Sequence, residues 1–118
     1  MTTWIRFEHA DKTGFGIVDG DTIRVHTGDL FGNSEPSGET VALADVTVMT
    51  PCTPSKMLAL WNNFHATMEK TGLPRPEGPW YFVKTPNTYA AANTDIRRPN
   101  ACQGKVLFEG ELGIVIGK

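Results

Sequence analysis

The sequence predicts a β-rich α+β fold, and three observations indicate it. Short apolar segments separated by turn residues fill the first 50 positions, a pattern typical of strands joined by tight turns. Trp80–Lys84 (WYFVK) combines aromatic and β-branched side chains, which favour strands. Lys105–Lys118 (KVLFEGELGIVIGK) has an almost purely apolar even-numbered face, so we expect a further strand there.

We expect residues 1–50 to form a small β-rich N-terminal unit. Two apolar segments flank Asp19-Gly20-Asp21, so a hairpin is predicted over residues 15–25. Residues 31–40 (FGNSEPSGET) are dense in Gly, Pro, Ser and Asn and are expected to form a loop. Residues 41–49 alternate again and complete the unit.

Residues 51–118 are expected to form a second part, and its first segment, Lys56–Lys70 (KMLALWNNFHATMEK), allows two interpretations. Its larger apolar residues are spaced by four, three and four positions, which suits one helix capped by Ser55. Alternatively, Met57–Trp61 is a short buried strand, and one of the next two residues, both Asn, begins a shorter helix that ends before the next glycine. The periodicity does not choose between them. The aromatic residues of this segment and of the WYFVK strand are expected to lie in the core.

Two glutamates mark the predicted strand Lys105–Lys118 as a candidate site. Glu109 and Glu111 project from the same face of an extended chain. Like charges at that separation repel, and a hard divalent cation is a suitable common partner. The alternative is a solvated strand face with two ordinary surface glutamates.

Composition and charge exclude several classes of protein. The formal net charge is −2 and no basic stripe is present, so we expect no nucleic-acid partner. The apolar runs are too short to span a membrane, and the first residues lack an apolar signal core. We therefore expect a cytoplasmic protein with no membrane partner, in which Cys52 and Cys102 are reduced thiols.

From Lys56 onward the chain resembles the fumarylacetoacetate hydrolase family. Four blocks carry the resemblance, and their order and approximate spacing agree with the family: LWNNFH at 60–65, LPRPEGPWYFVK at 73–84 followed by Thr-Pro, IRRP at 96–99, and FEGELGIVIGK at 108–118. The WNNFH motif is most similar to that of family members that are isomerases and decarboxylases of aromatic-catabolism intermediates, such as 2-hydroxyhepta-2,4-diene-1,7-dioate.

This resemblance implies a mixed β-roll of the fumarylacetoacetate hydrolase type, incomplete in this chain. It also implies an enzyme that uses Mg²⁺ or Mn²⁺ and acts on a small anionic keto acid or 1,3-dicarbonyl compound through a metal-stabilised enolate. Isomerisation, decarboxylation and C–C bond hydrolysis all fit that chemistry. Glu109 and Glu111 become two metal ligands, and a third carboxylate is expected beyond Lys118. Family members are commonly dimers, so we expect a homo-oligomer.

The resemblance also assigns roles to four other side chains. His65 matches the family's catalytic histidine, whose imidazole suits proton transfer near neutral pH. In many members a glutamate follows three residues later, where this chain has Met68; Glu69 comes one residue after it and still shares the helix face. Lys84 is expected to approach the substrate carboxylate. Asn63 either lines the pocket or caps the helix.

The neighbouring arginines, Arg97 and Arg98, are expected to lie at the surface, although pairing with an anionic substrate stays open. We also keep a second hypothesis for the chain as a whole. A small β-rich binding or oligomerisation module, which keeps the family core without the chemistry, would self-associate to cover an open sheet edge. The first hypothesis is that the chain is a fragment of a metal-dependent lyase, isomerase or hydrolase and is inactive alone.

Overall fold

A computed structural model describes residues 1–117, and these divide into two compact units. The first unit combines Met1–Cys52 with the described part of Ala91–Lys118, and the second is Thr53–Ala90. Most residues in regular structure lie in strands, and the helical elements are one seven-residue α-helix and two 3₁₀ turns in the described residues. The predicted β-rich fold with little helix is confirmed.

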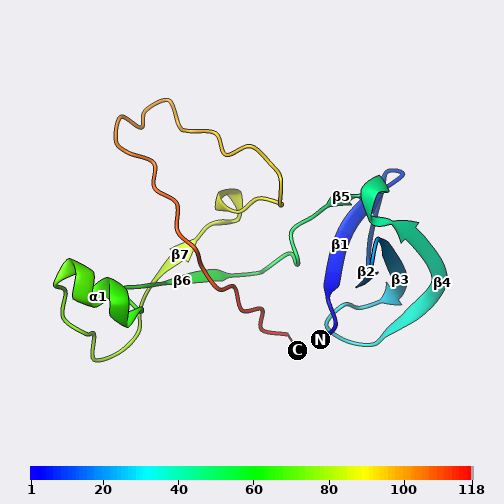
Figure 1. The fold of residues 1–118 in the computed structure, drawn as a ribbon, viewed down its shortest axis with the longest axis horizontal. Coiled ribbons are helices and arrows are strands. Elements are labelled where there is room, and N and C mark those ends of the chain that lie inside the picture. The colour runs from blue at the N-terminus through cyan, green and yellow to red at the C-terminus, as the bar shows by residue number, and fades with distance from the viewer. Residues whose placement is uncertain (118) are drawn as a thin grey trace. The chain divides into compact units, whose positions relative to one another are not determined.

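The first unit contains a five-stranded antiparallel sheet in the order β4-β3-β2-β1-β5 (Figure 1). The strands are β1 (Trp4–His9), β2 (Lys12–Asp19), β3 (Thr22–Gly28), β4 (Ser34–Ala42) and β5 (Thr47–Val48), with a 3₁₀ turn at Leu43–Asp45 before β5. The hairpin predicted over residues 15–25 is confirmed: Asp19 pairs with Thr22, and Gly20 between them has a φ of 59°.

The loop predicted over residues 31–40 is wrong from Ser34 onward, where β4 begins. β4 is an edge strand, so no strand pairs with its outer side in the described residues. Pro36 has no N–H to donate, but on that outer side no hydrogen bond between strands is lost. The register of β3 against β4 shifts between Arg24 and His26. The Ser37 hydroxyl donates to the Val25 carbonyl at 3.1 Å, beside this irregularity. A composition typical of loops is therefore compatible with an irregular edge strand.

Close packing in the five-stranded sheet depends on two glycines of β2. Phe7 on β1 is 3 % exposed and pairs with Gly14 across the ladder. A Cβ at Gly14 would lie 2.8 Å from the Phe7 ring, and one at Gly16 would overlap the Arg24 carbonyl oxygen and approach Ile23 to 2.8 Å. Ile23 is fully buried. Glycine at these positions leaves space for the two most buried apolar side chains of the sheet.

The second unit contains a two-stranded antiparallel sheet of β6 (Met57–Trp61) and β7 (Trp80–Lys84), which lie side by side in Figure 1. Helix α1 (His65–Thr71) follows β6, and a 3₁₀ turn (Pro86–Thr88) follows β7. Of the two interpretations of residues 56–70, the strand followed by a shorter helix is therefore correct. Gly72 ends the helix in the left-handed conformation, with φ 68° and ψ 17°.

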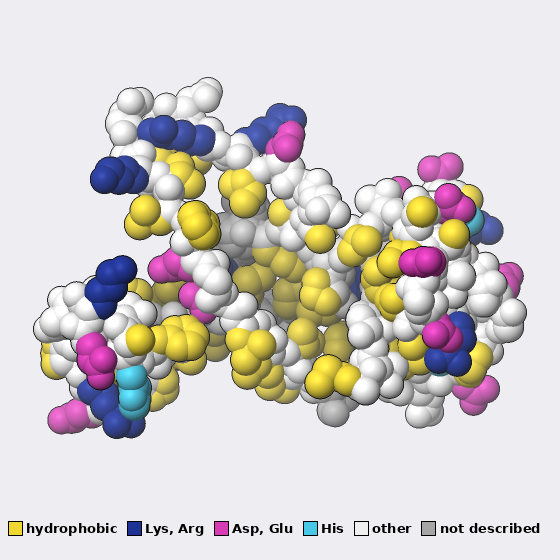
Figure 2. Space-filling view, in the orientation of Figure 1, with side chains coloured by type: hydrophobic (Ala, Val, Ile, Leu, Met, Phe, Trp, Pro, Cys, Tyr) yellow, Lys and Arg dark blue, Asp and Glu magenta, His cyan; other side chains and the backbone are white. Residues whose placement is uncertain are grey.

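The aromatic residues of β6 and β7 do not lie in a core, contrary to expectation. Their exposed fractions are 50 % for Trp61, 45 % for Trp80, 64 % for Tyr81 and 47 % for Phe82. No other strand in the described residues pairs with this two-stranded sheet, and its apolar side chains remain at the surface. Figure 2 shows hydrophobic side chains at the surface of the molecule.

The strand predicted over Lys105–Lys118 is not formed in residues 105–117, and Lys118 lies outside the described residues. A strand needs a neighbour for its backbone N–H and C=O groups, and no other described strand pairs with this segment. Its apolar side chains are exposed as a result, with Phe108 at 99 % and Ile114 at 77 %. The alternating apolar pattern of residues 105–117 is therefore not sufficient by itself to form a strand.

Candidate functional site

A cavity of about 140 Å³ lies within the second unit, beside the N-terminal end of α1. It is lined by Trp61, Asn62, Asn63, His65, Met68, Arg75, Pro76, Gly78, Pro79 and Trp80. These residues come from the end of β6, the start of α1 and the proline-rich loop that leads to β7. The cavity is smaller than the roughly 300–1,000 Å³ of most small-molecule sites, so it suits one end of a small ligand.

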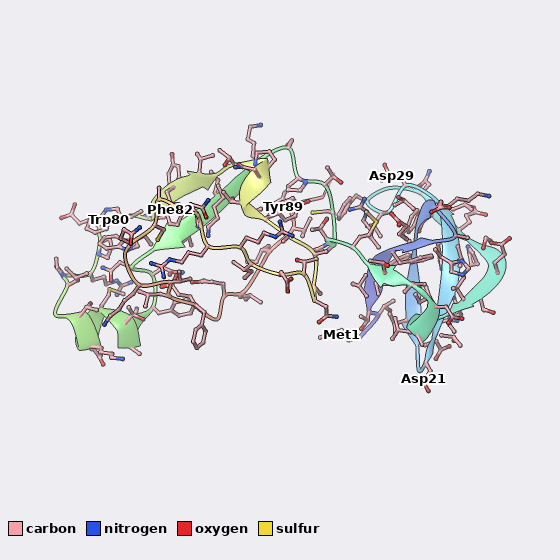
Figure 3. The ribbon with its side chains drawn as sticks, turned by 90° about the horizontal axis from the view of Figure 1, so that it is seen from above. Met1, Asp21, Asp29, Trp80, Phe82 and Tyr89 are labelled. Atoms are coloured by element: carbon pink, nitrogen blue, oxygen red, sulfur yellow. The ribbon has the colours of Figure 1, made fainter. Side chains whose placement is uncertain are left out.

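Stacked indoles flank the strand end of the cavity. Trp61 and Trp80 form a cross-strand pair, with ring centroids 5.3 Å apart and ring planes inclined by only 10°. Trp80 and Phe82 both lie on β7 (Figure 3). Aromatic pairs of this kind are stabilised by about 0.5–1.5 kcal/mol beyond area burial. The stack therefore gives the cavity a flat, firm apolar boundary.

Neither asparagine before α1 caps the helix. Phe64 is the N-cap residue, and no side chain accepts a hydrogen bond from the first turn. Asn62 instead adopts a left-handed backbone conformation with a φ of 53°, which asparagine tolerates better than most residues. Both Asn62 and Asn63 line the cavity, so the pocket-lining alternative is the one that the structure supports.

Asn62 is 8 % exposed, and its two amide atoms have different environments. Nδ2 donates a hydrogen bond to the Pro74 carbonyl oxygen at 3.3 Å, which ties the end of β6 to the proline-rich loop. Oδ1 is buried and has no hydrogen-bond partner. Because the Pro74 carbonyl can only accept, this bond also assigns which amide atom is the nitrogen.

His65 is the first residue of α1 and lines the cavity with an exposed imidazole. Within residues 1–117 the imidazole makes no hydrogen bond or ion pair, so its nitrogens are available to a ligand. Met68, three residues later, is 8 % exposed and lines the same cavity. Glu69 is exposed and is not among the lining residues. The side chain that accompanies His65 is thus a thioether rather than a carboxylate.

Lys84 is not in the cavity of His65 and Asn63. It pairs with Met57 at one end of the two-stranded sheet, while the Trp61–Trp80 pair that borders the cavity lies at the other end. Four residue steps along β7 correspond to about 13 Å. The Lys84 ammonium lies 5.4 Å from the Phe82 ring centroid, and the residue lines a separate, mostly apolar cavity of about 160 Å³ with Lys56 and Pro86.

Glu109 and Glu111 belong to the first unit, in the extended segment without regular structure. Both are exposed, and neither forms an ion pair within residues 1–117. Carboxylate oxygens are the ligands that Mg²⁺ and Mn²⁺ prefer, and Mg²⁺ often takes only one or two carboxylates while it keeps several waters. The pair therefore fits as part of a cation site. No group of three or more His, Cys, Asp or Glu gathers in the described part of the chain.

Arg98 stabilises the loop that precedes this segment. Its guanidinium donates to the carbonyl oxygens of Cys102 at 2.8 Å and of Gly104 at 2.9 Å. Arg97 is exposed. The arginine pair therefore contributes one loop contact and one surface charge, in line with the surface role expected for it.

Comparison with known proteins identifies the family. The model of the fumarylacetoacetate (FAA) hydrolase C-terminal domain matches residues 56–118, more than half of the chain. The chain belongs to the fumarylacetoacetate hydrolase family. A second model, Rv2993c-like N-terminal, matches residues 2–51.

Individual members of the family are similar over most of this chain. Protein Rv2993c of Mycobacterium tuberculosis is 32 % identical over 120 residues, which cover 96 % of this chain and 45 % of that protein. The structure of an uncharacterised protein from Mycobacterium abscessus matches with a TM-score of 0.70 and 27 % identity, over 86 % of this chain and 40 % of the other. The structure of 5-carboxymethyl-2-hydroxymuconate delta-isomerase from Mycobacterium smegmatis matches with a TM-score of 0.63 and 26 % identity, over 76 % and 35 %. This chain spans less than half the length of these relatives.

Within the family motif, sequence reasoning missed three features of the cavity. The sequence analysis gave no place in a site to Arg75, Trp80 or Met68, yet all three line the cavity. In residues 1–117, no helix has the length and apolar character needed to cross a bilayer.

Proposed function

We propose that this chain supplies part of the active site of a divalent-metal-dependent enzyme that moves protons on the enol and keto forms of a small anionic keto acid. The observation that carries the proposal is the placement of the family's motif histidine, His65, in a cavity of the second unit. Isomerisation is the reaction type favoured, because the isomerase from M. smegmatis matches over 76 % of this chain. Decarboxylation uses the same enolate chemistry.

His65 is proposed to be the group that moves the proton. Histidine is the side chain that most often serves as a general acid or base in enzymes. Because its ring has no partner within the described residues, it is free to approach a ligand carbon or oxygen. Hydrolysis would require a carboxylate to position water beside the histidine, and Met68 occupies that side of the cavity. Glu69 therefore has at most a supporting role in this proposal.

Glu109 and Glu111 are proposed to hold Mg²⁺ or Mn²⁺. When bound, such an ion supplies Lewis-acid stabilisation for the negative charge that develops on an enolate oxygen. Asn63 is proposed to bind the substrate from the His65 cavity. Lys84, at the other end of β7, is proposed to attract an anionic substrate rather than to contact the reacting carbon.

Metal-dependent turnover tests the proposal. A purified full-length protein that contains this chain, freed of metal with a chelator, is mixed with the enol form of a 2-oxo carboxylic acid, and loss of the enol absorbance is followed with and without Mn²⁺. We expect turnover only with the metal, and a loss of at least about 100-fold in Glu109→Gln or Glu111→Gln, since each removes one ligand charge. Glu39→Gln, which changes an exposed carboxylate on β4, is the matched control. Turnover that is equal without metal, or unchanged in both variants, contradicts the proposal.

A non-catalytic oligomerisation module is the second candidate, and exposed apolar surface favours it. Leu58, Leu60, Tyr81 and Val83 share one face of the two-stranded sheet, and each is at least 50 % exposed. Apolar surface of this kind is typical of an interface. Self-association in analytical ultracentrifugation together with no turnover would select this candidate.

A catalytic homodimer in the cytoplasm is the arrangement we propose for the enzyme.

A further inference from the structure

The segment 105–117, which carries the two proposed metal ligands, pairs with no strand in the described residues, but both of its ends are anchored. At its start, the Arg98 guanidinium donates to the carbonyl oxygens of Cys102 at 2.8 Å and of Gly104 at 2.9 Å. A guanidinium presents its donors in a rigid, planar fork, so the two bonds fix these carbonyl groups relative to each other. The segment therefore begins from a loop that a single side chain holds closed.

The other end of the segment lies against the loop between β3 and β4. A Cβ added at Gly117 would lie 3.5 Å from Phe31 Cδ1 and 3.9 Å from Phe31 Cβ, which is ordinary van der Waals contact. Phe31 lies between these two strands, and both residues belong to the first compact unit. The last described glycine of the segment therefore packs on an aromatic side chain of the first unit.

Hydrogen bonds within the loop hold Phe31 in place. Its N–H donates to Asp29 Oδ1 at 3.0 Å. The Asp29 N–H donates to the Asn33 carbonyl oxygen at 2.9 Å, which closes the loop at its base. Gly28 adopts a φ of 95°, and a Cβ there would overlap the same carbonyl oxygen. The loop therefore presents the aromatic ring from a constrained backbone, as an anchor requires.

We propose that Arg98 and Phe31 are positioning residues for the cation site, because they fix the two ends of the segment between them. The inference rests on the proposed function in taking Glu109 and Glu111 as ligands of Mg²⁺ or Mn²⁺. A flexible segment loses conformational freedom when its carboxylates bind a cation, and that loss weakens binding. Anchors at both ends remove part of this freedom before the cation binds. The first unit thereby contributes to metal affinity through a loop that contains no ligand.

Mn²⁺ binding to a full-length protein that contains this chain tests the proposal, with free Mn²⁺ measured by electron paramagnetic resonance. Phe31→Ala removes the ring that lies against Gly117, and Arg98→Met removes the hydrogen-bond donors. We expect each variant to raise the Kd for Mn²⁺ by at least about fivefold, the effect of one lost contact or hydrogen bond. Unchanged affinity in both variants overturns the proposal.

Two control variants separate anchoring from other effects. Phe31→Leu keeps an apolar side chain at the anchor, so its Kd should stay within about twofold of the parent value. Arg97→Met removes the same charge from the neighbouring exposed residue. Loss of a positive charge alone favours a cation, so this variant should bind Mn²⁺ at least as tightly as the parent. Weakening in Arg97→Met equal to that in Arg98→Met would overturn the role of Arg98.

Backbone order in the metal-free protein distinguishes this proposal from the proposed function. We expect ¹⁵N order parameters of Glu109 and Glu111 near about 0.85 in the parent and below about 0.6 in Phe31→Ala and Arg98→Met, the values of rigid and flexible backbone. Signals of the five-stranded sheet should stay in place, and Arg98→Met decides the question if Phe31→Ala does not fold. Unchanged order in these variants overturns the positioning role. If the parent binds no Mn²⁺, the proposed function fails, and the order parameters still decide whether the two residues anchor the segment.

Discussion

At the scale of single residues, the chemistry available in the cavity depends on which side chain of α1 lies beside His65. Positions three and four residues after the histidine both lie near its face of a helix. The structure places Met68 in the cavity and leaves Glu69 exposed. A thioether neither positions water nor shares a proton with imidazole, and no carboxylate is among the residues that line this cavity.

Substitution of the two polar residues of α1 should therefore have unequal effects. His65→Gln removes the titratable ring and should lower kcat for enol loss by about 10²–10⁴-fold, the usual contribution of a general acid or base. Glu69→Gln should change kcat by less than about threefold, because the carboxylate does not face the cavity. The measurement is kcat for both variants with saturating Mn²⁺. Comparable losses in the two variants would restore Glu69 to the mechanism.

At the scale of elements, the five-stranded sheet depends on close contact between β1, β2 and β3. Gly16 on β2 leaves no room for a Cβ, which would overlap the Arg24 carbonyl oxygen on β3. The pairing of Gly16 with Val25 places these backbones in direct register. The Ile23 side chain, fully buried, closes the same region.

Gly16→Ala should consequently destabilise the sheet. Overpacking of this kind costs about 1–3 kcal/mol, because strand backbones must move apart to admit the methyl group. Thermal unfolding followed by circular dichroism should show a lower midpoint than in the parent. Gly104→Ala is the matched control, since a Cβ there meets nothing within 4 Å and its φ is not positive. Equal midpoints for Gly16→Ala and the parent would show that the sheet absorbs the methyl group.

Local chemistry explains which elements could be predicted from the sequence. The hairpin over residues 15–25 depends on a short turn. Strand β7 depends on its own β-branched and aromatic residues. The end of α1 depends on Gly72. The edge strand β4 and the unpaired segment 105–117 depend on whether a distant strand is available, which alternation within a segment does not encode.

The cavity was predictable only in part for the same reason. The motif identified His65 and Asn63, both of which line it. The hydrogen bond from Asn62 to Pro74 crosses twelve residues, and Arg75 reaches the cavity through an irregular loop with several prolines. Neither placement follows from periodicity, because both depend on how that loop folds back against the end of β6.

At the scale of the whole molecule, the proposed chemistry draws on residues of both compact units. His65 belongs to Thr53–Ala90, and Glu109 and Glu111 belong to the unit that includes Met1–Cys52. Family membership of residues 56–118 is the reason to assign them to one reaction. If these residues serve one reaction, the effects of substituting them are not independent, because substitutions of residues that act together have strongly non-additive effects on the rate.

A double-mutant cycle on turnover tests this central claim most directly. Loss of the enol absorbance with Mn²⁺ is measured for the parent, His65→Gln, Glu109→Gln and the double variant. We predict that each single variant loses at least about 100-fold in kcat and that the double variant loses little more than the worse single variant. Losses in the double variant equal to the product of the two single losses would contradict a shared catalytic role.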